Sequence, residues 1–89
     1  LRQNMQLLID GLKTINNLDF LSPIQTDYRA GIVTVTIPGC DSLSLYNRLK
    51  KNNVICAHRG GGIRFSPHFY TPKEKILSAV DTLHELVTS

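Results

Sequence analysis

One stretch of the sequence decides the fold: Gly60-Gly61-Gly62-Ile63-Arg64-Phe65-Ser66-Pro67-His68-Phe69-Tyr70. Its glycines permit a tight reversal of the chain. Residues 63–66 then alternate apolar and polar, as a half-buried strand does, and Pro67 ends the strand because it cannot donate to a sheet ladder. The alternation directs Ile63 and Phe65 to one face and Arg64 to the other. The stretch therefore predicts a short strand, 63–66, that holds one cation in a fixed direction.

A helix is predicted directly after this strand, from Pro72 to about Val87. Thr71 can cap the helix, Pro72 suits its first position, and Glu74 can complete a capping box. Its apolar residues recur at helical spacing, so they form a stripe that needs a partner. We expect this stripe to cover the apolar side of strand 63–66, through Ile76, Val80 and Leu83.

The earlier part of the chain supplies the other predicted elements. They are a helix from Leu1 to about Asn17, a weak edge strand at Leu18–Ser22, a strand at Gly31–Ile37, a helix from Asp41 or Ser42 to about Asn52, and a strand at Val54–His58. The Gly31–Ile37 segment is rich in β-branched residues and is the clearest strand in the chain. The Val54–His58 segment is predicted from its almost wholly apolar composition.

The order of these elements predicts an α+β fold, in which helices pack on one face of a small, mostly antiparallel sheet of three or four strands. Strand 31–37, the helix after it and strand 54–58 form a crossover. If strand 63–66 inserts between those two strands, the unit is a split β-α-β motif. Such a sheet also suits a free-standing module that binds a small anion or a protein partner.

Composition limits the class of protein. The 89 residues fit one domain, 1–89, with 42% hydrophobic and 19% charged residues, as soluble globular proteins have. The net charge of +3 comes without a basic array, so no nucleic acid is expected as a partner. No apolar run reaches the roughly 20 residues of a membrane span. Cys40 and Cys56 are too few for a disulfide framework, which favours a reducing cytoplasm. Because the chain begins at Leu1 and not Met, we expect a piece of a longer protein.

Two motifs in this sequence resemble signatures of a known family. The run G-I-R-F-S-P-H-F-Y-T-P-x-E-K-I, from Gly62 to Ile76, resembles the end of the class V aminotransferase family of pyridoxal-phosphate (PLP) enzymes, often R-x-S-P-H-x-Y-N-T-x-x-E-I. Arg29-Ala30-Gly31-Ile32-Val33 resembles a second family signature, R-x-G-I-V. With the spacing between them, the resemblance covers nearly the whole chain. It implies the C-terminal small domain of a larger enzyme, similar to the selenocysteine lyase, cysteine desulfurase and isopenicillin N epimerase-like group.

The sequence departs from the family pattern in two places. Tyr70-Thr71-Pro72 stands where the family often has Tyr-Asn-Thr, which leaves any role of that asparagine in doubt. The short connection 59–62 lacks the active-site cysteine that desulfurases of this class carry between the last two strands. The chain therefore looks less like a desulfurase than like an aminotransferase, epimerase or lyase of the same superfamily.

The resemblance also implies roles for particular residues. Arg64 corresponds to the arginine that holds the substrate's α-carboxylate, and the guanidinium fork matches a carboxylate through two parallel hydrogen bonds. The plainer alternative is a surface arginine paired with an acid. His68 and Arg59 are weaker candidates for the same cleft. PLP and its Schiff-base lysine belong to the large domain, which also builds a homodimer in the family.

This fragment alone is expected to be inactive, with no catalytic or cofactor-binding residue of its own. Its lysines fall on predicted polar helix faces, at Lys13, Lys50, Lys51, Lys73 and Lys75. The triple glycine could cradle a phosphate, but a tight turn between strands fits it better. His58, His68 and His84 do not have the spacing of a metal site. Neither Cys40 nor Cys56 has a neighbouring base in the sequence to activate it.

Overall fold

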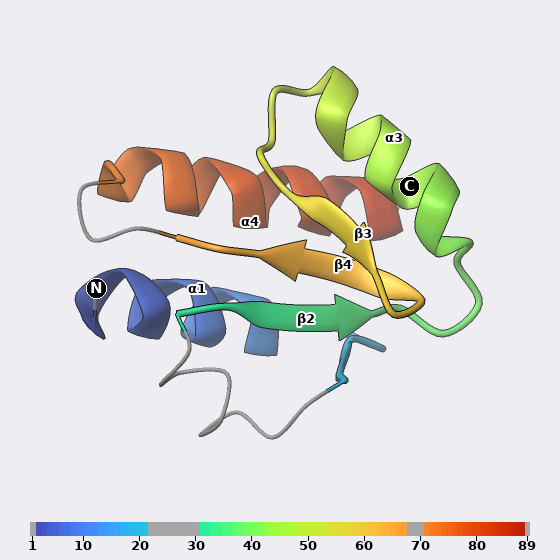
Figure 1. Ribbon diagram of the computed structural model, residues 1–89, viewed down its shortest axis with the longest axis horizontal. Coiled ribbons are helices and arrows are strands. Elements are labelled where there is room, and N and C mark those ends of the chain that lie inside the picture. Colours follow the sequence, from blue (N-terminus) through green and yellow to red (C-terminus); the bar gives the residue numbers. More distant parts are fainter. Residues whose placement is uncertain (1, 22–30, 68–70, 89) are drawn as a thin grey trace.

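The computed structural model describes residues 2–21, 31–67 and 71–88. Within these ranges the chain forms a four-stranded sheet covered by helices (Figure 1). The elements in chain order are α1 (Arg2–Lys13), β1 (Asp19–Phe20), β2 (Val33–Thr36), α3 (Ser42–Lys51), β3 (Ala57–Arg59), β4 (Gly62–Phe65) and α4 (Lys73–Thr88). This is the α+β class predicted from the sequence.

The strands lie in the order β1-β2-β4-β3, and each neighbouring pair is antiparallel. Because β4 lies between β2 and β3, those two strands run parallel to each other and α3 connects them. This arrangement is the predicted split β-α-β motif, which is thereby confirmed. In register, Arg64 of β4 faces Thr34 of β2 on one side and Ala57 of β3 on the other.

The glycine run turns the chain from β3 into β4. Arg59 pairs with Gly62, so Gly60 and Gly61 form a two-residue hairpin loop. Their φ angles are 56° and 79°, and two positive φ values are what the favoured type I′ hairpin requires. The hydroxyl of Ser42 at the start of α3 donates to the Gly61 carbonyl at 2.7 Å. The tight turn predicted for these glycines is confirmed.

The third glycine of the run has a different reason to be glycine. A Cβ atom on Gly62 would lie 2.5 Å from the Val35 carbonyl oxygen and 2.6 Å from Cδ1 of Leu21. Gly62 therefore allows the chain of β4 to approach β2 closely while Leu21 lies over it.

The core lies between the sheet and the helices. Val33 and Val35 of β2 pair with Phe65 and Ile63 of β4, and all four side chains are buried. Buried residues of the helices complete the same cluster: Met5, Leu8, Ile9, Leu12, Leu45, Leu49, Ile76, Val80 and Leu83. The predicted burial of Ile63 and Phe65 with the apolar stripe of the last helix is confirmed.

The predicted strand at Val54–His58 is mostly wrong. Pairing with β4 begins only at Ala57, and the strand ends at Arg59. The backbone N–H of Val54 instead donates to the Leu49 carbonyl at 3.0 Å, which continues the end of α3. Asn53, with φ of 63°, is the left-handed residue that closes this helix. Val54 and Cys56 thus pack against the core without pairing in the sheet, while Ile55 is exposed.

The other boundaries shift by a few residues. The first helix ends at Lys13, before the predicted Asn17, because Thr14 and Ile15 donate to carbonyls three residues back, at 3.1 Å each. The last helix begins at Lys73, one residue late, with the Pro72 carbonyl accepting from Lys75 and Ile76. The predicted edge strand 18–22 is shorter in the structure, as β1, and so is the predicted strand 31–37, as β2. The predicted strand 63–66 corresponds to β4, which begins and ends one residue earlier. The cap of α3 is Asp41, whose carboxylate accepts from the Ser44 N–H at 3.0 Å.

Helices α1 and α4 cross at a glycine. A Cβ atom on Gly11 would lie 2.9 Å from both Cγ1 and Cγ2 of Val80, which is buried in α4. A glycine inside a helix costs up to about 1 kcal/mol relative to alanine, so its presence in α1 calls for a packing reason. The close approach of α4 supplies that reason.

We predict that Gly11→Ala lowers the free energy of unfolding by about 1–2 kcal/mol, since overpacking a rigid β-branched side chain outweighs the gain in helix propensity. Chemical denaturation measures the change. In a Val80→Ala background the same substitution should become stabilising, because the crowded methyl groups are gone. Stabilisation by Gly11→Ala in the wild-type background would contradict the close packing.

Candidate functional site

The sheet face opposite the helices, here called the outer face, carries the polar side chains of the strands. Residues that pair across antiparallel strands share a face, so the register places Thr34, Arg64 and Ala57 in one row. The same rule places Arg59 on the outer face beside Gly62. Two arginines of neighbouring strands therefore lie on the face opposite the helices that the structure describes.

Arg64 is held in the middle of this row. Its strand, β4, is paired on both sides, so the direction of its Cα–Cβ bond is fixed by the pleat. The Nε–H of the half-buried Arg64 donates to Oγ1 of Thr34 at 3.5 Å, and Thr34 is only 6% exposed. With Nε directed to Thr34, the two terminal nitrogens carry the remaining four N–H donors of the guanidinium. A planar fork of this kind can bind a carboxylate by two parallel hydrogen bonds.

The other predicted binding residues are placed differently. Arg59 is exposed at the end of β3, and its Nη1 donates to the carbonyl of His58 at 3.2 Å. It shares the outer face with Arg64 but lies two residues further along its strand than Ala57, the partner of Arg64. His68 lies outside the described residues, as does Arg29 of the second family motif.

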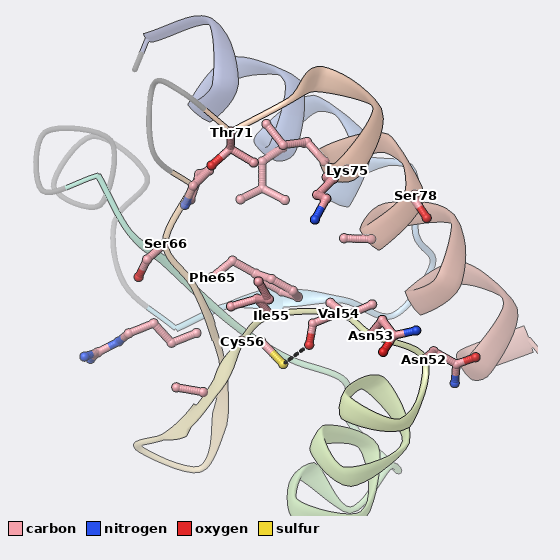
Figure 2. Close-up of a pocket in the computed structure, with 16 residues that line it drawn as sticks. Asn52, Asn53, Val54, Ile55, Cys56, Phe65, Ser66, Thr71, Lys75 and Ser78 are labelled. Carbon is pink, nitrogen blue, oxygen red and sulfur yellow. Dashed lines mark hydrogen bonds between the residues drawn. The ribbon is translucent and has the colours of Figure 1, made fainter.

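A pocket opens where β3 begins and β4 ends. It measures about 600 Å³ and lies between segment 52–57, the end of β4 and the first half of α4 (Figure 2). Its apolar lining comes from α1, segment 52–57, β4 and α4, through Leu8, Val54, Phe65, Ile76 and Ala79. Arg64 also contributes to the lining. The volume lies within the range of small-molecule sites in proteins.

The sequence prediction missed two residues of this pocket. Ile55 was assigned to a buried strand, but it is 87% exposed because segment 54–56 does not pair with the sheet. Lys75 was assigned to a polar helix face, and it is indeed exposed, but it also lines the pocket with Ser78 and Ala79. The spacing of these three residues along α4 is the signal in the sequence that they share a helix face.

Both cysteines are free thiols, but they lie in different settings. Cys40 is exposed, while Cys56 is half-buried and lines the pocket. Burial raises the pKa of the Cys56 thiol, and the positive charge of Lys50 offsets only part of that rise. Because the thiolate is the reactive form, Cys56 is the poorer nucleophile at neutral pH.

We predict that iodoacetamide alkylates Cys40 before Cys56 in the folded protein, with a difference in rate of about tenfold or more. Mass spectrometry of digested samples taken over time measures both rates. In denaturant the rates should converge, because the burial that protects Cys56 is lost. Equal rates in the folded protein would contradict the half-buried position of Cys56.

In the part of the chain that the structure describes, the remaining histidines and the acidic residues do not form a metal-binding cluster. His58 faces the helices, where its ring lies 6.1 Å from that of Tyr46, centroid to centroid. Among the described residues, no group of three or more His, Cys, Asp or Glu side chains could hold a metal ion. Within the same ranges, every helix is too short or too polar to cross a membrane.

Comparison with known proteins gives two likenesses. The "Uncharacterized aminotransferase YcbU" of Bacillus subtilis (strain 168) is 51% identical over 35 residues, which are 39% of this chain and 10% of that protein. A solved structure described as "NIFS-LIKE PROTEIN" superposes with a TM-score of 0.81 at 16% identity, covering 98% of this chain and 27% of that one. The chain thus spans only a small part of either protein. No protein-family model matches the sequence.

Proposed function

We propose that this chain, a class V aminotransferase-like domain, binds the substrate carboxylate in a PLP-dependent enzyme that acts on an amino acid. The local identity to an aminotransferase and the shared fold of the NifS-like protein support the family resemblance seen in the motifs. Because the chain spans only part of those proteins, the activity belongs to a longer polypeptide in this proposal. The proposal covers both transamination and lyase-type chemistry.

One observation carries the proposal, namely the position of Arg64 on the outer face. A substrate anchor needs a fixed direction, and β4 supplies it through pairing on both sides. It also needs N–H donors that point to the substrate. The hydrogen bond to Thr34 uses the Nε–H of Arg64, and the fork of the two terminal nitrogens remains for a carboxylate. Arg59 on the same face adds positive potential toward an anion, although it lies further along the sheet.

The lysines of this chain do not have the setting of a PLP Schiff-base lysine. A Schiff-base lysine is a buried amine with a lowered pKa, and Lys13, Lys50, Lys51, Lys73 and Lys75 are all exposed. When PLP is bound it supplies an electron sink for reactions at the substrate's α-carbon. In our proposal the cofactor lies in a large domain of the same polypeptide, which pairs with a second copy, and this chain contributes the carboxylate contact. The free thiols suit a cytoplasmic location.

We predict that Arg64→Lys in the longer protein lowers kcat/KM for the amino-acid substrate by about tenfold to more than a hundredfold. Lysine keeps the charge but not the bidentate fork, and a charged hydrogen bond contributes roughly 1.5–3 kcal/mol. Steady-state kinetics measures the loss. PLP binding, followed by its absorbance, should be nearly unchanged because Arg64 contacts substrate only.

Arg59→Lys is the matched control, since it makes the same change on the same face one strand away. It should reduce kcat/KM far less than Arg64→Lys. If Arg64→Lys leaves turnover of the amino acid intact, Arg64 does not anchor the carboxylate and the proposed function of this domain is wrong.

A further inference from the structure

The pocket beside α4 combines an apolar interior with cationic side chains. Among the described residues that line it, the charged ones are Arg64 and Lys75, and no acidic side chain joins them. A smaller hollow adjoins it around residues 53–56, and its charged lining residues are Lys50 and Lys75. Lys75 therefore belongs to both hollows. The local charge is positive on an apolar background, which complements an apolar anion.

The geometry of the pocket separates its apolar and charged parts. Figure 2 shows the amine of Lys75 reaching from α4 over the cavity, toward Ile55 and Phe65 below it. Ile55 leaves 87% of its surface exposed at the rim, while Phe65 is buried beneath. A ligand with an alkyl or aryl body could cover these side chains and place an anionic head at the amine. Covering exposed apolar surface next to a cation is favourable through both burial and charge.

We propose that this pocket is a binding site for a medium-sized apolar monocarboxylate. The hydrocarbon part would lie against Ile55, Phe65 and Ile76, and the carboxylate would accept hydrogen bonds from the Lys75 ammonium. Asn52 and Asn53 also line the pocket, and the Asn52 carboxamide already donates to the Arg48 carbonyl at 2.8 Å. Arg64 also lines this pocket, but here the carboxylate is placed at Lys75, whereas the anchor proposed above uses the terminal fork of Arg64 on the outer face.

The test is a titration of the protein with sodium octanoate, followed by amide chemical shifts in two-dimensional NMR. Saturable shifts should appear at residues 52–57 and 75–79. The same titration with 1-octanol isolates the contribution of the carboxylate, and octanol should bind several-fold more weakly. Saturable binding that perturbs Thr34 and the rest of the outer face instead of the pocket would overturn the proposal, as would an absence of saturable binding.

Two lysine variants complete the experiment. Lys75→Gln should weaken octanoate binding about three- to tenfold, the range expected when a partly exposed charge contact is lost, and should leave octanol binding unchanged. Lys73→Gln is the matched control, because Lys73 is exposed on the same helix but does not line the pocket. Equal weakening by both variants would overturn the assignment of Lys75.

Discussion

The antiparallel pairing of β4 with β2 on one side and β3 on the other is the constraint on which the rest of this structure depends. A strand paired on both sides can neither rotate nor slip by one residue without exchanging its two faces. Ile63 and Phe65 therefore enter the core, and Arg64 must leave it. The two positive-φ glycines set the register, because they fix a hairpin loop of two residues between Arg59 and Gly62. A few residues thus determine both the core and the direction of the candidate anchor.

The same strand contributes residues to both surfaces to which we assign functions. On the outer face, the Nε–H of Arg64 donates to Oγ1 of Thr34, so the neighbouring strand β2 helps to hold the guanidinium of the candidate anchor. On the other side, Phe65 forms part of a pocket whose wall is the irregular segment 54–56. Irregular segments supported by rigid elements often carry binding residues. Here the rigid support comes from β4 and α4.

Much of the fold could be predicted because local signals agreed with tertiary packing. The alternation in 63–66 and the glycine turn each predict a structure that the sheet contains, while the cap left open between Asp41 and Ser42 is Asp41. The segment 54–56 could not be predicted correctly, because composition does not reveal whether a backbone N–H bonds to a sheet or to the end of a helix. The Leu49 carbonyl accepts a hydrogen bond from the N–H of Val54, so this segment does not pair with the sheet and Ile55 is exposed. The pocket follows from that exposure, so the sequence could not indicate it. The outward direction of Arg64, by contrast, could be predicted from the alternation of strand 63–66, while its role in binding stays a prediction.

The central claim is that Arg64 holds the substrate carboxylate. The most direct measurement is a crystal structure of the longer protein with an amino-acid substrate or an unreactive analogue bound. We expect both terminal nitrogens of Arg64 to lie at about 2.7–2.9 Å from the two carboxylate oxygens, which is the geometry of a bidentate charged pair. We also expect Nε to remain directed to Thr34. A carboxylate bound by other residues, with the guanidinium of Arg64 turned to solvent or to a surface acid, would contradict the central claim.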